Sequence, residues 1–401
     1  MIAALLAALL AAARVDPCAG AASDGWIEAR LRADPRFAPL LERPADLRLQ
    51  VLVAEVHGEP GGARRLVRHG YRVGAEYIYP ASAIKTFAAV AAMHAVAELP
   101  ATASGARADL DTPLASCTWG ASRCARTRDP SNRDGGAITL GHEVRKMQIV
   151  SDNHAFNRLY DFVGHREINL YLRTHGFPDV RIEHRLSTRE RPAGHRRTPR
   201  FQLRLGDEVL EVAARDSDLV TRPADAPPVL VGVAHIGPDG ARVPAPRDFI
   251  DNNAASLCAL QRLTIALVAP ELGAVDLELA AADRERLLAA MQQDPRAATN
   301  PRFTAPAQTI ERFKPLLPGL ARVLPRTRIV YINKAGKAYG FHVENAYIAD
   351  KTTGRAFFIT AAVYADRDGV VDDDRYDYAD VTVPFFADLG ELLARALLRG
   401  P

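Results

Sequence analysis

The sequence lacks an excess of charge of either sign. Its 51 lysines and arginines are nearly balanced by 48 aspartates and glutamates, which leaves a net charge of +3 on 401 residues. Nucleic acids and acidic membrane surfaces are bound mainly through clustered positive charge, so we expect neither as a partner. Because 48% of the residues are hydrophobic, the chain can bury a large core, and we expect a globular monomer.

Long apolar runs are also scarce. The N-terminal run, residues 1–13, is too short to span a bilayer, and small residues at 19–21 would suit cleavage by a signal peptidase. We therefore predict a signal peptide over residues 1–21 and export to the periplasm or the medium; the alternative is an Ala/Leu-rich structural helix. Cys18 could indicate a lipid anchor, but the Asp-Pro pair before it fits that processing poorly, so the mature chain should have no transmembrane segment or anchor.

The chain has only four cysteines. Cys117 and Cys124 bracket a turn-like segment, and in an exported protein they are predicted to form a disulfide; the alternative is two free thiols. Cys258 lies in an apolar helical stretch and is predicted to be a small buried hydrophobic residue. No Cys/His spacing indicates zinc, and the acidic run at 366–374 lacks the alternating ligands of a calcium loop. We expect no metal and no cofactor.

Lysine is rare in this chain. Six lysines stand against 45 arginines. Arginine keeps its proton in proteins and cannot act as a base, so a site that needs a neutral amine must retain lysine. Each lysine is therefore a candidate functional residue.

Strand patterns occur near both ends of the chain, and helical patterns fill the middle. Helical spacing of apolar residues is found at 24–43, 81–99, 141–148, 153–164, 251–269, 280–293 and 383–399. Strand patterns are found at 47–56, 65–73, 327–333, 340–348 and 356–364, and a hairpin pattern at 201–212. This order predicts one sheet assembled from distant segments, with a helical portion inserted into it.

We accordingly predict a single domain over residues 22–401. Its sheet portion comprises residues 24–80 and 325–401. Its helical portion comprises residues 81–324 and includes an insertion at 201–245, which Pro-rich segments flank.

The first pattern with chemical content is Ser82-Ala-Ile-Lys85 at the start of a predicted helix. Residues i and i+3 share a helix face, so the amine can reach the hydroxyl proton. The alternative is an ordinary helix start with a surface lysine. However, the residues after Lys85 are almost wholly apolar, and a lysine in such a helix is costly unless it has a task or a partner.

Two further patterns accompany it. Ser151-Asp152-Asn153 lies between two helical stretches, where the plain alternative is a helix-capping cluster. Lys334-Ala335-Gly336 follows a strand and places a cation beside an approachable backbone edge, where the plain alternative is a strand that ends in a turn. In this order the three patterns are specific. Together they resemble the penicillin-recognising serine enzymes, and in particular the class A β-lactamase branch, over roughly residues 24–399.

This resemblance implies an α+β fold. It consists of an antiparallel five-stranded sheet with the N- and C-terminal helices packed on it, together with an all-helical subdomain. It also implies that Ser82 is the acylated nucleophile and that Lys85 accepts or relays its proton. Ser151 would pass a proton to the leaving nitrogen, Asn153 would hold the substrate's side-chain carbonyl, and Lys334 would attract the substrate carboxylate.

The third motif agrees with the family pattern at its glycine and differs from it at its middle residue. The resemblance places the oxyanion hole at the backbone N–H groups of Ser82 and Lys337, the residue after Gly336. The family usually carries Thr or Ser in the middle of this motif, where its hydroxyl helps to bind the substrate carboxylate. Ala335 offers no hydroxyl, which weakens the case for ordinary penicillin recognition.

The sequence offers two candidates for the glutamate that activates the deacylating water. Residues 181–187 resemble the family's Arg-x-Glu-x-x-Leu loop, with Ser187 in place of Asn, so Glu183 is the first candidate. An alternative register makes Glu183 a structural acidic residue and leaves the water site without a glutamate; Glu190 is a further candidate. The long spacing between the second and third motifs is consistent with the insertion lying near the cleft.

We therefore expect a serine hydrolase that forms an acyl-enzyme, acts on a small acyl substrate and hydrolyses β-lactams. One alternative is a D-alanyl peptidase, esterase or penicillin-binding protein with slow deacylation, which Ala335 and the uncertain glutamate favour. A second alternative is a non-catalytic protein that binds wall peptides. Retention of both Lys85 and Lys334 in an arginine-dominated chain argues against the second alternative.

Overall fold

The computed structural model describes residues 24–58, 62–117, 124–125, 128–188, 190, 192–273 and 275–399. The predicted signal peptide and Cys18 lie outside these residues.

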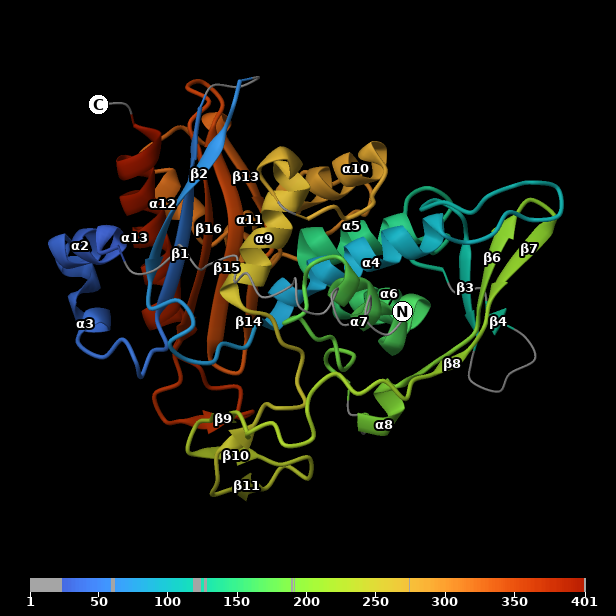
Figure 1. The fold of residues 1–401 in the computed structure, drawn as a ribbon, viewed down its shortest axis with the longest axis horizontal. Coiled ribbons are helices and arrows are strands. Elements are labelled where there is room, and N and C mark those ends of the chain that lie inside the picture. Colours follow the sequence, from blue (N-terminus) through green and yellow to red (C-terminus); the bar gives the residue numbers. More distant parts are fainter. Residues whose placement is uncertain are drawn as a thin grey trace, which may run out of the picture.

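An antiparallel sheet forms the centre of one half of the molecule (Figure 1). Its main path runs β13-β15-β16-β1-β2, and β14 continues the β13 edge by pairing with β15. The strands are β1 Gln50–His57, β2 Arg65–Tyr71, β13 Ile329–Asn333, β14 Gly336–Ala338, β15 Phe341–Asp350 and β16 Ala356–Tyr364. Every residue of β16 is buried, because both faces of the sheet are covered. The predicted assembly of the sheet from the two ends of the chain is confirmed.

The terminal helices cover one face of this sheet. They are α2 Trp26–Ala33, the 3-10 turn Pro35–Phe37, α3 Ala38–Leu41, α12 Leu317–Leu320 and α13 Val383–Leu393, which passes into a wider turn at Ala394–Leu398. The single helix expected at 24–43 is broken at Pro35, since proline lacks the N–H that would continue the helix. Apolar residues of these helices and of the sheet form one continuous core.

The helical portion covers the other face (Figure 1). Its helices are α4 Lys85–Ala97, α5 Leu140–Val150, α6 Asn153–Val163, α7 His165–Thr174, α8 Pro192–His195, α9 Leu257–Val268, α10 Ala281–Gln292 and α11 Ile310–Phe313. α4 lies in the middle and packs against α5, α6 and α7. Ten of its thirteen residues are buried, which explains its apolar sequence. No helix in the described part of the chain is both long and apolar enough to cross a membrane.

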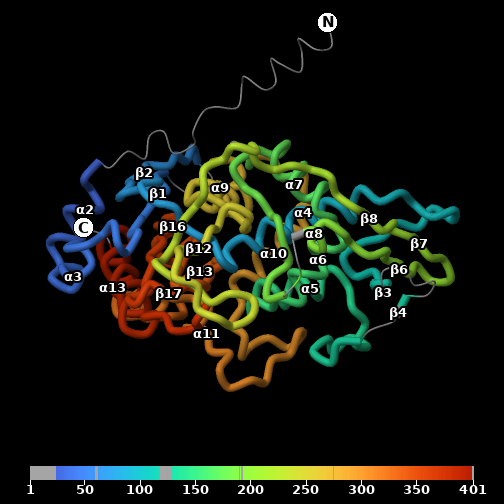
Figure 2. Tube along the Cα trace, turned by 90° about the horizontal axis from the view of Figure 1, so that it is seen from below, coloured from blue at the N-terminus to red at the C-terminus, as the bar shows by residue number. Residues whose placement is uncertain are grey.

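The fold class is confirmed, but the helical portion also contains strands. A four-stranded sheet of order β4-β3-β6-β7 lies at the end of the molecule opposite α2 (Figures 1 and 2). It is formed by β3 Leu114–Cys117, β4 Cys124–Ala125, β6 Phe201–Leu205 and β7 Glu208–Val212. The predicted hairpin is therefore correct. It pairs with β3, a strand too short to show a periodic pattern in the sequence.

Short strand pairs within and beside the insertion reach back to the sheet portion. They are β5 Arg197–Thr198, β8 Arg215–Asp216, β9 Leu230–Val231, β10 Ala234–Ile236, β11 Arg242–Val243 and β12 Arg247–Asp248. β10 pairs with β17, Val370–Val371, in the segment between β16 and α13. The insertion thus bridges the two portions of the molecule.

The cysteines are paired more fully than expected. Cys117 and Cys124 form the predicted disulfide, which joins β3 to β4. The prediction that Cys258 is simply a small buried hydrophobic residue is wrong, because it too is disulfide-bonded and is only half-buried.

Candidate active site

The candidate nucleophile follows a strained backbone residue. Ala81 has a φ of +47°, in the left-handed region that non-glycine residues rarely adopt, and it starts the 3-10 turn Ala81–Ile84 that leads into α4. Such a conformation costs of order 1–3 kcal/mol and is typical of functional sites. Ala81 is buried, so the surrounding packing holds it. Ser82 is therefore presented by a rigid turn, as its predicted role requires.

Lys85 is the first residue of α4, and its side chain is fully buried. Its Nζ donates hydrogen bonds to Ser151 O at 2.6 Å and to Asn153 Oδ1 at 2.5 Å. Burial lowers the pKa of Lys85 well below its ordinary value, and the positive charge of Lys334 lowers it further. A neutral amine has two N–H groups, and these two acceptors satisfy them, which leaves the nitrogen lone pair free to accept a proton.

Ser151 lies at the junction of α5 and α6, in a left-handed conformation with φ +57°. The capping alternative is correct for its neighbour Asp152, whose carboxylate accepts the N–H of Ala155 at 2.8 Å. Ser151 and Asn153 do not cap the helix through their side chains but contact Lys85 instead. The junction therefore serves both α6 and the candidate site.

Lys334 approaches the same hydroxyl from the sheet. It follows β13, and its Nζ donates to Ser151 Oγ at 2.9 Å and to Ala335 O at 3.0 Å. Lys85 Nζ lies 3.2 Å from the same Ser151 oxygen. Burial lowers the pKa of Lys334 to about 7. Two amines from distant parts of the chain thus converge on one serine hydroxyl.

Gly336 brings the third motif against the nucleophile. A Cβ on this residue would lie 2.5 Å from Ser82 N and 2.7 Å from Ala83 N, so only glycine fits. β14 therefore passes directly beside the backbone N–H of Ser82, and Lys337 is the next residue along that strand. The two backbone donors expected for an oxyanion hole come from these neighbouring segments.

Comparison with known proteins agrees with this geometry. Residues 72–220 match the model of the β-lactamase enzyme family, a range that contains the first two motifs. These residues are similar to that family, so the predicted resemblance is confirmed over this range. The third motif lies outside the matched range, and the structure brings it to the other two.

Solved β-lactamase structures resemble the chain over most of its length. The one from Streptosporangium roseum shares 17% identity and a TM-score of 0.48 over 92% of this chain and 98% of its own. The β-lactamase from Desulfarculus baarsii is 15% identical, with a TM-score of 0.49 over 93% of this chain and 97% of its own. The β-lactamase from Xanthomonas campestris is 16% identical, with a TM-score of 0.46 over 92% of this chain and 97% of its own. No match is found among curated proteins. The fold assignment rests on the sheet order and the matched family region.

Behind Lys334 the candidate site has a buried polar network that the sequence patterns did not reveal. Asn333 accepts a hydrogen bond from Lys314 Nζ at 2.8 Å and donates to Glu344 Oε2 at 3.2 Å. Burial lowers the pKa of Lys314 to about 7 and raises that of Glu344 to about 8. The scarcity of lysine is the one sequence signal that could have singled out Lys314.

Glu183 is held away from these motifs. Its carboxylate lies 3.2 Å from His165 Nε2 and accepts a hydrogen bond from the hydroxyl of Thr221. Burial alone would raise the pKa of Glu183, but these two hydrogen bonds keep it below its ordinary value. Its described contacts do not include Lys85 or Ser151. Glu190, the other candidate, pairs with Arg185 at 2.8 Å.

Two other residues of the same loop contact α6, the helix that begins at the second motif. Asn153 Nδ2 donates to Ser187 Oγ at 2.7 Å, and Asn157 Oδ1 accepts the backbone N–H of Leu186 at 2.7 Å. This placement agrees with the alternative register, in which Glu183 is structural. The described loop residue bonded to Asn153 is a serine and not a glutamate.

Phe249, four residues after the predicted insertion, packs beside the site. Its ring contacts Tyr79, three residues before Ser82, at a centroid distance of 5.5 Å. It also contacts Tyr339, which follows the third motif, at 5.4 Å. The chain that leaves the insertion thus reaches the segments that carry Ser82 and Gly336.

The close approach at Gly336 yields a test. Gly336→Ala must move β14 away from the Ser82 backbone, and a displacement of about 1 Å can slow catalysis about 100-fold. We expect acylation to fall at least that far while the circular dichroism spectrum is retained. Gly273→Ala is the control, because the nearest atom to its added Cβ would be 3.6 Å away. Normal acylation by Gly336→Ala would contradict the close packing described above.

Proposed function

We propose that this chain forms an acyl-enzyme on Ser82 and that its substrates include β-lactams. The observation that carries the proposal is the convergence of Lys85 and Lys334 on the Ser151 hydroxyl, 3.2 and 2.9 Å away. The same desolvated Lys85 starts α4 directly after the turn that carries Ser82, and an amine of this kind can activate a serine. A non-catalytic binding protein would gain nothing from burying two such amines.

The proposed acylation proceeds through groups of this chain alone. Lys85 accepts the Ser82 proton while Oγ attacks the substrate carbonyl carbon. The resulting oxyanion is stabilised by the backbone N–H groups of Ser82 and Lys337. When the C–N bond breaks, Ser151 donates its proton to the leaving nitrogen and regains one from Lys85. Lys334 favours this transfer by its charge and binds the substrate carboxylate.

Deacylation is the proposed weak step. In the described structure, Glu183 contacts His165 and Thr221, while Ser187 bonds to Asn153 and Leu186 to Asn157. Among the described residues no carboxylate is bonded to Lys85, so a water molecule there would have no glutamate to activate it. This observation favours the alternative function of a penicillin-binding protein or D-alanyl peptidase that hydrolyses its acyl-enzyme slowly. The absence of a hydroxyl at Ala335 favours it as well.

We further propose that the protein is an exported monomer that acts in the periplasm or the medium on a small acyl substrate. The Cys117–Cys124 disulfide supports an oxidising compartment.

Intact-mass measurement after incubation with a penicillin tests the proposal. We expect a stoichiometric adduct on the wild-type chain that persists for minutes, because acylation is supported and deacylation is not. The adduct should map to the peptide that contains Ser82.

Ser82→Ala is the control and should show neither adduct nor turnover. Rapid turnover without an adduct would support β-lactam hydrolysis but contradict slow deacylation. Absence of both adduct and turnover with penicillins, cephalosporins and D-alanyl esters would overturn the proposed function.

Glu183→Gln separates the two loop registers. If Glu183 activated water, the variant would trap the acyl-enzyme. We expect instead a deacylation rate within about twofold of wild type and a lower Tm at neutral pH, since hydrogen bonds to a charged carboxylate contribute about 1.5–3 kcal/mol. The difference in Tm should shrink in acid, where the wild-type carboxyl is also protonated. A longer-lived adduct in Glu183→Gln would restore Glu183 as the water-activating residue.

The two amines also predict a bell-shaped pH dependence of kcat/KM for acylation. The acid limb reflects Lys85, which must be neutral, and the alkaline limb reflects Lys334, which must be charged. Because the pKa of Lys334 is about 7, its charge is lost as the pH rises, and kcat/KM should fall about 100-fold by pH 9. Lys334→Arg keeps the charge and should abolish the alkaline limb but not the acid limb. An unchanged alkaline limb in Lys334→Arg would assign that limb to another group.

A further inference from the structure

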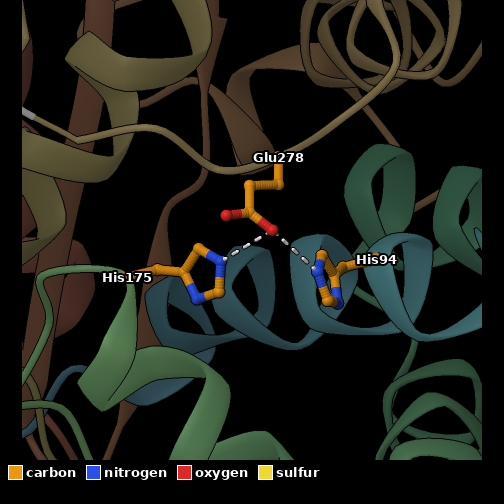
Figure 3. Close-up of side chains that lie close together, drawn as sticks. All are labelled: His94, His175 and Glu278. Atoms are coloured by element: carbon orange, nitrogen blue, oxygen red, sulfur yellow. Dashed lines mark hydrogen bonds and ion pairs between the residues drawn. The ribbon is translucent and has the colours of Figure 1, made fainter. Parts of the chain in front are cut away.

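Three potential metal ligands meet at the far end of the nucleophile helix. His94 lies in the last turn of α4, His175 follows α7, and Glu278 lies in the segment before α10 (Figure 3). The ligand atoms of all three lie within 4.8 Å of one another. Figure 3 shows both imidazole rings turned toward one carboxylate oxygen.

The spacing suits a shared ion better than direct hydrogen bonds. Glu278 Oε2 lies 3.4 Å from His94 Nε2 and 3.6 Å from His175 Nε2. These distances are at or beyond the limit of a useful hydrogen bond. With zinc–ligand distances of about 2.0–2.2 Å, tetrahedral ligands lie about 3.3–3.5 Å apart. The observed separations match that edge length closely.

The hydrogen bonds of His175 leave its Nε2 available. Its Nδ1 lies 2.8 Å from the carbonyl oxygen of Tyr171, to which it donates. That bond fixes the tautomer with a lone pair on Nε2, as second-shell carbonyls do for zinc-bound histidines. Nε2 is buried, and no hydrogen-bond partner for it exists among the described residues.

Tyr171 holds the three elements in place. Its ring stacks on His175 at a centroid distance of 4.1 Å and packs against His94 at 4.8 Å. Its hydroxyl donates to the backbone oxygen of Leu277 at 2.8 Å and so anchors the residue before Glu278. The three ligands are therefore pre-positioned by one side chain, which lowers the cost of ordering them around an ion.

A second group of three potential metal ligands is less suited to bind an ion. Asp129, His142 and Glu143 also cluster, but two cations already neutralise them. Lys146 binds Asp129 at 2.6 Å, and Arg158 binds Glu143 at 2.5 Å. A metal ion there would have to displace both partners. His94, His175 and Glu278 have no such competing cation among their described contacts.

We propose that His94, His175 and Glu278 bind one zinc ion, with water as the fourth ligand. Two imidazoles and one carboxylate form a donor set typical of zinc. Glu278 is 62% exposed, so the ion can enter from solvent. The ion would join the C-terminal turn of α4 to α7 and to the segment before α10. Because Lys85 starts the same helix, the site would stabilise the element that positions the catalytic amine.

Zinc binding to the metal-free full chain tests this proposal independently of catalysis. We expect calorimetry with Zn²⁺ alone to give one equivalent bound and the Tm to rise on addition of zinc. His94→Ala and Glu278→Gln should each weaken binding at least tenfold and abolish the rise in Tm. X-ray absorption should show two imidazoles in the zinc shell.

His57→Ala is the matched control, because this half-buried histidine pairs with one carboxylate, Glu55, and lies outside the cluster. It should bind zinc like wild type, and its Tm should respond to zinc in the same way. Absence of binding at 100 μM Zn²⁺ (about the weakest affinity expected of a built site) would mean that the three residues form only an ion-pair cluster and would overturn the proposal. Equal binding by wild type and His94→Ala would place the ion elsewhere and would also overturn it.

Discussion

The site depends on an amine that the fold takes out of water. Lys85 starts the most deeply buried helix, and its charged form would lose several kcal/mol of hydration there. The acceptors that meet it are Ser151 O and Asn153 Oδ1, both uncharged. Since neither can compensate a full positive charge, the buried amine is stabilised mainly by loss of its proton. The apolar sequence of α4 therefore favours a neutral amine, and the α5–α6 junction orients it.

Ser151 is where the two portions of the molecule meet. Lys85 reaches its hydroxyl from the helical portion, and Lys334 reaches it from the sheet. Gly336 brings the sheet edge against the nucleophile turn, and the Lys314–Asn333–Glu344 network fixes the strand end behind Lys334. The same burial that neutralises Lys85 also lowers the pKa of Lys334, so the site balances two amines that repel each other. This balance is why acylation should be confined to a narrow range of pH.

Much of this arrangement could be predicted from the sequence, for a physical reason. Lysine is scarce, so Lys85 and Lys334 stood out, and the order of their motifs predicted a shared site. Alternation and helical spacing predicted the main strands and helices because burial enforces those periods. The sequence left the register of the 181–187 loop open, because the register depends on long-range contacts such as those of Glu183 with His165 and Thr221. The buried network and the histidine cluster were missed for the same reason: their members come from separate segments with no local pattern.

The protonation state of Lys85 is the quantity on which the account depends. With only six lysines, a chain labelled with ¹³C at lysine Cε should give an NMR spectrum simple enough to assign by single substitutions. We predict that the resonance lost in Lys85→Met titrates well below the ordinary lysine range, because burial lowers the pKa of this amine. The Lys334 resonance should titrate near pH 7. A Lys85 resonance that titrates near pH 10, like an exposed lysine, would contradict the account, because the amine could not then act as the base for Ser82.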